Sequence, residues 1–223
     1  MWTCVIWAVS LGMIGAAAPA FAQEPRVEIS ALVGWTFSEG VNGDPVATAD
    51  GNIFDRVDPK SSFKWGLGAG VPVGENYEVG FLFGQQLTTL EASGTNRVDV
   101  GDMTVNTYHG YFAYNFGEVD SGFRPYALLG LGATNFSSVD YTRRNGQAAT
   151  IGGETRFSST WGAGLKLFPR PNIGLRFGAQ WTPTYINSTA AGWWCDPFWG
   201  CYLVGNAQYA NQFDLSGGII FRF

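Results

Sequence analysis

Apolar and polar side chains alternate with a period of two along eight segments of the chain. In the last segment, one face carries Phe213, Leu215, Ile219, Phe221 and Phe223. The opposite face carries Asp214, Ser216, Gly218 and Arg222. This alternation predicts a β-strand with one face in apolar surroundings and the other in polar surroundings.

Seven earlier segments repeat the pattern. They cover residues 27–37, 63–71, 77–84, 107–116, 124–134, 157–167 and 173–182. In segment 124–134 both faces are apolar, so the register is less clear. We place Ala127, Leu129, Leu131 and Ala133 outward, because Gly130 and Gly132 then face a narrow interior.

The connections between these segments alternate between long and short. Residues 38–60, 87–103, 135–156 and 183–212 read as long polar loops, and residues 74–76, 117–122 and 169–172 as short turns. Transmembrane β-barrels typically have an even number of strands and segments of about ten alternating residues. Their short turns lie at one end of the barrel and their long loops at the other. A soluble β-sandwich also alternates, but it has no reason to sort its connections by length.

Aromatic residues gather near both ends of the predicted strands. Such girdles mark the two edges of an apolar band bounded by lipid headgroups. With the N-terminus in the periplasm, the girdle at the outer ends of the strands comprises Trp35, Phe63, Tyr108, Phe157, Trp181 and Phe213, and the girdle at the inner ends comprises Tyr77, Phe116, Phe221 and Phe223. Because a backbone in lipid must satisfy its hydrogen bonds internally, the first and last strands are expected to pair. The predicted fold is therefore all-β, a transmembrane eight-stranded antiparallel up-and-down β-barrel.

Composition agrees with this fold. Only 14% of residues are charged, 16% are aromatic and 31 are glycine, as expected for many glycine-punctuated strands. The net charge of -5 argues against a nucleic-acid partner, which needs clustered Lys and Arg.

Residues 1–22 read as a cleaved secretory signal peptide, and residues 23–223 as the barrel. The first segment has no charged side chain, an apolar run from Val5 to Ala18 and an A-x-A site at Ala20-Phe21-Ala22. The usual Lys or Arg near the start is missing, and a membrane anchor is the alternative, although the run is shorter than the roughly 20 residues a spanning helix needs. Cys195 and Cys201 then remain as a predicted disulfide in an oxidising compartment.

Several short motifs carry a family resemblance. They are Arg124-Pro125-Tyr126 with Leu129-Gly130-Leu131-Gly132, Gly162-Ala163-Gly164-Leu165-Lys166, Gly174-Leu175-Arg176, and Phe221-Arg222-Phe223. With these motifs the chain resembles OmpA-like eight-stranded outer-membrane β-barrels of the porin-family domain type. The resemblance implies a monomeric barrel in the bacterial outer membrane, inserted by the assembly machinery with Phe221 and Phe223 as the assembly signal. It implies no substrate.

An eight-stranded barrel is just wide enough to be filled by its own side chains. The predicted inward charges are Glu28, Lys64, Glu78, Lys166, Arg176, Asp214 and Arg222. Since buried charges are costly unless paired, we expect Lys166, Arg176 and Arg222 to match Glu28 and Glu78, with Asp214 near Lys64. Glu28 and Arg222 are the first expected pair. A structural plug is favoured over a gate.

The sequence offers no catalytic or metal site. His109 is the single histidine, and its neighbour two residues on is Tyr111, so this strand lacks the serine that small lipid-hydrolysing barrels place there. Asp50, Gly51, Asn52 and Asp55 lack the spacing and closing Glu of a calcium loop. We therefore predict no enzyme, no cofactor and no metal.

One loop stands out by its aromatic content. Around Cys195 and Cys201 it carries Trp193, Trp194, Phe198, Trp199 and Tyr202. These side chains either fold onto one another as a cap or form a contact surface for a host surface, another envelope component or the outer leaflet itself. The predicted function is structural and surface-interacting, with an adhesin or surface antigen as candidate roles and outer-membrane lipid and lipopolysaccharide as surroundings. The alternatives are a narrow porin-like channel for ions or small solutes and, more weakly, a lipid-modifying enzyme.

Overall fold

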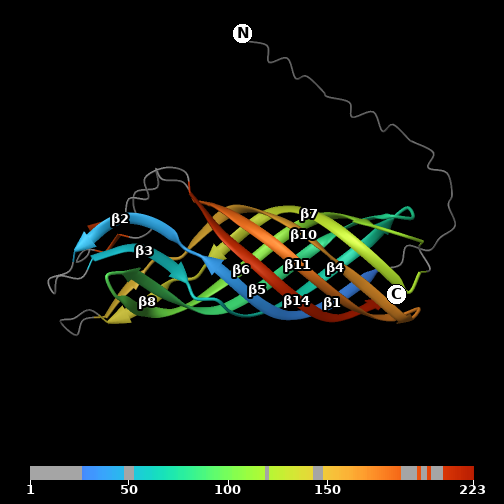
Figure 1. Ribbon diagram of the computed structural model, residues 1–223, viewed down its shortest axis with the longest axis horizontal. Coiled ribbons are helices and arrows are strands. Elements are labelled where there is room, and N and C mark those ends of the chain that lie inside the picture. Colours follow the sequence, from blue (N-terminus) through green and yellow to red (C-terminus); the bar gives the residue numbers. More distant parts are fainter. Residues whose placement is uncertain are drawn as a thin grey trace, which may run out of the picture.

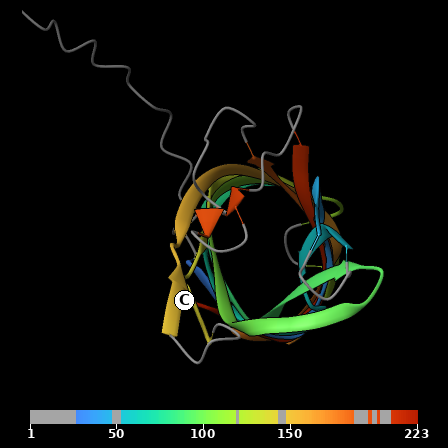
Figure 2. The ribbon, with the colours of Figure 1, turned by 90° about the vertical axis from the view of Figure 1, so that its left-hand side faces the viewer.

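The computed structural model shows a closed antiparallel β-barrel (Figure 1). The structure describes residues 27–47, 53–118, 121–142, 148–186, 195–196, 200–201 and 208–223. Viewed from the end that carries β2, β3 and β8, the strands form a ring (Figure 2). The eight barrel strands are β1 (Glu28–Glu39), β4 (Ser62–Val73), β5 (Tyr77–Gly94), β6 (Arg97–Asn115), β7 (Phe123–Phe136), β10 (Glu154–Arg170), β11 (Ile173–Ile186) and β14 (Gln208–Arg222).

The first and last strands close the barrel, as predicted. β1 pairs with β14 from Glu28↔Arg222 to Glu39↔Asn211. All other barrel neighbours are consecutive, and β5 pairs with β6 to complete the ring. Every barrel strand therefore has hydrogen-bonding partners on both sides, which is the condition for crossing lipid.

The predicted inward and outward faces are confirmed. The interior holds buried polar residues such as Thr36, Thr134 and Gln86, whereas Trp35, Phe81 and Leu129 are exposed on the outer surface. The uncertain segment adopts the chosen register, because Tyr126 and Leu128 are buried and Leu129 and Leu131 exposed. All ten aromatics of the two girdles are exposed on the lipid-facing surface of the barrel: Trp35, Phe63, Tyr77, Tyr108, Phe116, Phe157, Trp181, Phe213, Phe221 and Phe223.

The short turns lie at the end of the barrel that carries the C-terminus (Figure 1). Gly74, in the turn between β4 and β5, has a φ of 73°, and Gly117, after β6, has a φ of 88°. Both values lie in the left-handed region that glycine tolerates best. By the rule that periplasmic turns are short, this end faces the periplasm.

The long connections contain more strand than the sequence predicts. The expected loop at residues 87–103 is a continuation of the hairpin, in which β5 reaches Gly94 and β6 begins at Arg97. A register shift between Leu90 and Glu91 interrupts the ladder there. The period-two signal is already lost before this bulge, because Gln and Thr side chains occupy both faces of residues 85–89 although the strands continue.

Three further hairpins lie at the extracellular end, as the extended β5–β6 hairpin does. β2 (Val41–Ala47) pairs with β3 (Ile53–Pro59), and β3 pairs with the outer part of β5. β8 (Val139–Thr142) pairs with β9 (Ala148–Ile151), and β12 (Cys195–Asp196) with β13 (Gly200–Cys201). Within the described residues, no helix is long and apolar enough to cross a membrane.

Candidate functional site in the barrel lumen

The lumen near the periplasmic end contains a buried ion network. Lys166 Nζ donates to Glu28 Oε2 at 2.6 Å and also to Glu78 Oε2, so one ammonium group joins two carboxylates. Arg222 Nη2 donates to Glu28 Oε1 at 2.7 Å. These four residues come from β1, β5, β10 and β14, and all are at most 7% exposed. The predicted Glu28–Arg222 pair is confirmed.

Neutral groups complete this network. The hydroxyl of Tyr111 donates to Glu78 Oε1 at 2.5 Å, and Asn115 Nδ2 donates to Glu78 Oε2 at 3.2 Å. The guanidinium of Arg222 lies 3.8 Å from the centre of the Phe168 ring. Since buried charges need both a partner and satisfied hydrogen bonds, these contacts stabilise a fixed arrangement of the side chains.

The prediction for Arg176 is wrong in its partner. Arg176 Nε donates to the Tyr126 hydroxyl at 3.2 Å, and Nη1 donates to Ser30 Oγ at 3.4 Å, with no ion pair to Glu28 or Glu78 among the described residues. Its guanidinium lies 4.9 Å from the Tyr126 ring centre and 5.9 Å from that of Tyr111. Inward-facing tyrosines therefore take the place of a carboxylate through hydrogen bonding and cation–π contact.

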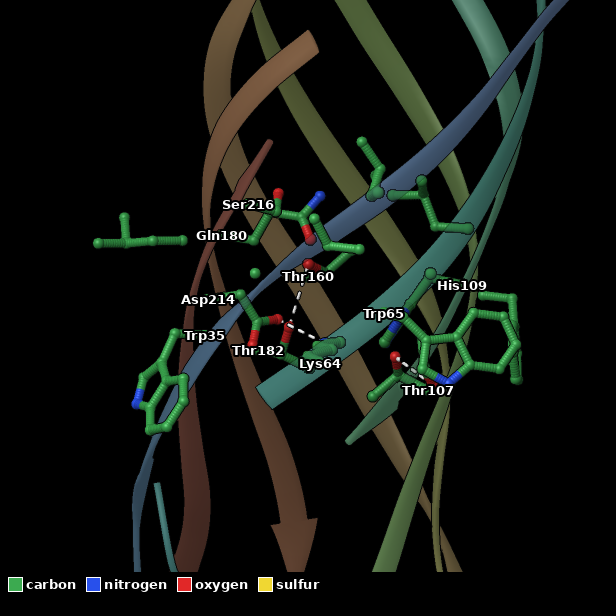
Figure 3. A pocket seen from close by; sticks show the side chains of 18 residues that line it. Trp35, Lys64, Trp65, Thr107, His109, Thr160, Gln180, Thr182, Asp214 and Ser216 are labelled. Carbon is green, nitrogen blue, oxygen red and sulfur yellow. Dashed lines mark hydrogen bonds and ion pairs between the residues drawn. The ribbon is translucent and has the colours of Figure 1, made fainter. Parts of the chain in front are cut away.

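A second ion pair lies farther toward the outer end. Lys64 Nζ donates to Asp214 Oδ2 at 2.6 Å, and Thr36 Oγ1 donates to Asp214 Oδ1 at 2.5 Å. This pair was predicted from the alternation, and it is confirmed. It borders a small cavity of about 40 Å³ that is also lined by His109, Thr107 and Gln180 (Figure 3). A cavity of this size with polar groups in its lining has room for on the order of one to three water molecules.

His109 has a partner that the sequence reasoning missed. Its Nε2 lies 2.9 Å from Ser158 Oγ, which comes from β10. Thr134 donates to Ser158 at 2.9 Å, and Thr184 donates to Thr134 at 3.0 Å. The strand of His109 itself carries no serine two residues on, but the barrel brings Ser158 close because β6 and β10 lie on opposite sides of β7.

This histidine–serine contact differs from a catalytic triad. Ser158 is fully buried, and among the described residues no carboxylate hydrogen-bonds to the second ring nitrogen of His109. A nucleophile needs an oriented base and access to substrate. The contact is therefore part of the buried hydroxyl network of Ser158, Thr134 and Thr184 and not a reactive centre.

Toward the outer mouth the lumen is filled by amides and then by apolar side chains. Gln86 Nε2 lies within 3.2 Å of three acceptors, Ser38 Oγ, Ser62 Oγ and the Lys60 carbonyl oxygen, and Gln86 Oε1 accepts from Gln212 at 2.8 Å. Beyond this layer lies an apolar cluster, the outer cap, formed by Leu90, Met103, Val105, Phe136 and Val139. Among the described residues the cap continues the inward faces of β5, β6 and β7, so the outer part of the lumen is also occupied.

Several predictions lie partly or wholly outside the described residues. These are the signal peptide at residues 1–22 and the loop contact candidates Trp193, Trp194, Phe198, Trp199 and Tyr202. The backbone register places Cys195 opposite Cys201, which is compatible with the predicted disulfide. The bond itself stays a prediction.

Comparisons with known proteins agree with this architecture. A search of curated proteins finds no match. Among solved structures, OprG from Pseudomonas aeruginosa is similar with a TM-score of 0.63 at 14% identity, covering 89% of this chain and 96% of OprG. AlkL, solved in lipid bilayers, is similar with a TM-score of 0.55 at 14% identity, and the match covers 100% of this chain and 97% of AlkL. Neisserial surface protein A has a TM-score of 0.50 at 14% identity, and the match covers 89% of this chain and 96% of that protein.

At such identities these structures support the fold alone. The family model for the outer membrane protein beta-barrel domain matches residues 8–214, which is most of the sequence. Together with the closed eight-stranded barrel, this match locates the protein in the bacterial outer membrane. The chain belongs to the outer membrane protein β-barrel domain family.

Proposed function

We propose that this protein is a closed-lumen barrel that acts through its extracellular surface, as a structural and surface-interaction protein and not as an open channel. The observation that carries the proposal is the succession of filled layers along the lumen. The Glu28–Lys166–Glu78 network, the Arg176 layer, the Lys64–Asp214 pair, the Gln86–Gln212 layer and the outer cap follow one another.

The extracellular end supports the same proposal. The β5–β6 ladder extends to Ser93↔Arg97, and β3 adds to its edge. Leu90, Met103 and Val105 are each at most 3% exposed in this region. A hairpin with its own apolar cluster presents a defined surface, which an interaction protein needs more than a channel does.

A narrow channel is the second candidate, and the cavity beside Lys64 and Asp214 favours it. Its volume of about 40 Å³ provides space for water inside the barrel. Conduction would require this space to connect past Arg176 and Tyr126 on one side and Gln86 on the other. In the described residues these side chains are hydrogen-bonded across the lumen.

Single-channel recording in planar bilayers separates the two candidates. We expect the purified protein to give no stable conductance. The variant Tyr126→Ala/Arg176→Ala removes bulk from the middle of the lumen and serves as a control that a gap in this barrel is detectable. Large, stable openings of the unaltered protein would refute the closed-lumen proposal.

The interaction role is tested separately by adhesion. Replacing Trp193, Trp194, Phe198 and Trp199 with Ser is expected to leave a heat-modifiable barrel and to abolish binding of the producing cells to host or envelope surfaces. Unchanged adhesion would eliminate this loop as the contact surface.

We propose no enzymatic activity, because Ser158 beside His109 is inaccessible. Incubation of the protein with outer-membrane lipid, followed by mass spectrometry, checks this. Appearance of deacylated lipid that disappears in Ser158→Ala would reverse the proposal.

A further inference from the structure

An unusual group of side chains lies on the lipid-facing surface at the outer ends of β1, β11 and β14. We call it the rim patch, and it consists of Glu39, Trp181, Tyr185, Tyr209 and Asn211. All five residues point outward, since they alternate along their strands with the buried Thr182, Thr184, Ala210 and Gln212 and with the half-buried Ser38.

Polar contacts connect the patch across three strands. Trp181 Nε1 donates to Asn211 Oδ1 at 3.2 Å, and Asn211 Nδ2 donates to Glu39 Oε2 at 3.1 Å. Asn211 is opposite Glu39 on one side and Pro183 on the other. The carboxylate and the amide retain unused acceptor and donor capacity on their solvent side.

Two aromatic rings border this polar chain on its outer side. Tyr185 and Tyr209 are paired in the β11–β14 register, and their ring centres are 5.7 Å apart at 59°. They are 37% and 55% exposed. Exposed tyrosines combine an apolar ring face with a hydroxyl, which suits a surface that is part apolar and part wet.

The patch lies where the lipid-facing apolar surface ends. Two positions farther into the membrane, β1 carries Phe37 and β14 carries Phe213. These two residues are opposite each other in the register, and both are exposed on the lipid-facing surface. A lipid whose acyl chains contact these phenylalanines would present its headgroup to Asn211, Glu39 and the two tyrosines. The patch thus continues the membrane-facing surface into the headgroup region.

The chemistry of the patch favours a headgroup rich in hydroxyl groups. Ring faces pack against the apolar faces of a sugar, while an amide and a carboxylate accept hydrogen bonds from its hydroxyls. None of the five residues is cationic, so phosphate groups alone would find no charged partner here. We propose that the rim patch docks the sugar headgroup of lipopolysaccharide from the outer leaflet through its hydroxyl groups. This inference rests on the proposed outward presentation of this end of the barrel.

The neighbouring strands β4, β5 and β6 supply a matched control. Trp65 Nε1 donates to Gln85 Oε1 at 3.1 Å, and Gln85 Nε2 donates to Asn106 Oδ1 at 2.9 Å. This chain repeats the tryptophan–amide contact of the rim patch. The outward residues beyond it are Leu87 and Thr104, so it has neither the tyrosine pair nor the carboxylate.

Competitive lipid retention tests the proposal. The full protein is equilibrated in mixed micelles of lipid A and phosphatidylglycerol with the same acyl chains, and native mass spectrometry measures the lipid that stays bound. We expect the protein to retain about fivefold more lipid A than phosphatidylglycerol. Tyr185→Ser/Tyr209→Ser and Asn211→Leu are expected to abolish the preference, whereas Gln85→Leu/Asn106→Leu should retain it.

Monophosphoryl lipid A distinguishes sugar from phosphate recognition, and it is expected to be retained as well as lipid A. Loss of preference with this lipid, equal retention of lipid A and phosphatidylglycerol, or an equal effect of the control variant would each overturn the proposal. Heat-modifiable migration checks that each variant is folded, and Tyr185→Leu/Tyr209→Leu replaces the serine variant if that one fails. Conductance and adhesion are measured independently, so a failure of the proposed function is recognised apart from a failure of lipid docking.

Discussion

Arg222 Nη2 lies 2.7 Å from Glu28 Oε1, and Arg222 Nε lies 3.1 Å from the same oxygen. The two residues are directly opposite in the β1–β14 register, so this contact joins the first and last strands of the barrel. Glu28 also accepts from Lys166, which is shared with Glu78. Barrel closure and the occupation of the periplasmic end of the lumen therefore depend on the same side chains.

Replacing Arg222 with Met is expected to lower the free energy of unfolding by about 3 kcal/mol, because Glu28 loses one of its two cations in a buried site. Urea unfolding of the protein in lipid vesicles measures this. Arg170→Met, at an exposed position on β10, is the matched control and should change stability little. Adding Glu28→Gln to Arg222→Met should restore part of the lost stability. Equal stability of Arg222→Met and Arg170→Met would contradict the role assigned to Arg222.

The sequence predicts the barrel well because lipid imposes a strict alternation of side chains. Phe213 and Asp214 can be assigned to opposite faces without a structure, since a spanning strand has apolar surroundings on one side only. The Glu28–Arg222 pair followed from the adjacency of the first and last strands, and the Lys64–Asp214 pair from the placement of both residues toward the same end of the barrel, together with the cost of unpaired buried charge.

The sequence predicts less where contacts depend on the curvature of the barrel or on irregular strands. Ser158 meets His109 across β7, and no spacing along the chain indicates that contact. Arg176 pairs with Tyr126 because an inward tyrosine is geometrically closer than a carboxylate. Leu90, Met103 and Val105 keep the inward phase of β5 and β6, but Gln and Thr side chains on both faces of residues 85–89 conceal this continuation in the sequence.

Two glycines on the same barrel are expected to respond differently to substitution by Ala. A Cβ on Gly218 would lie 1.9 Å from the Ala31 carbonyl oxygen, so β1 and β14 must move apart. A Cβ on Gly110 would have its nearest neighbour at 3.9 Å. Gly218→Ala should lower the free energy of unfolding by about 1–3 kcal/mol, as overpacking does, while Gly110→Ala should be nearly neutral. Equal urea midpoints for the two variants would show that the β1–β14 contact adjusts without cost.

The outer cap is expected to stabilise the extracellular hairpin locally. Leu90 is 1% exposed within the cap, whereas Leu87, three residues earlier on the same strand, is 54% exposed. Leu90→Ala should cost about 3 kcal/mol of local stability, as for a buried leucine, and increase amide exchange in β5 and β6 beyond the membrane. Leu87→Ala is the control, and the same increase in both variants would mean that the cap does not hold the hairpin together.

Asp58, on β3 outside the membrane, is expected to make the extracellular end less stable as pH rises. Burial raises the pKa of this carboxyl above its ordinary value of 3.8, even though the Arg56 guanidinium lies 3.4 Å away and lowers it. The folded state therefore binds a proton more tightly than the unfolded state does, so protonation stabilises the fold and stability falls as pH passes upward from 3.8 through the raised pKa. Amide exchange of β3, corrected for intrinsic rates and followed from about pH 4 to about pH 7, should show protection decreasing with pH. Asp58→Asn removes the titrating group, and its protection should be independent of pH over this range and higher than that of the parent at neutral pH. A parent protein whose β3 protection increases with pH would contradict the sign of this effect.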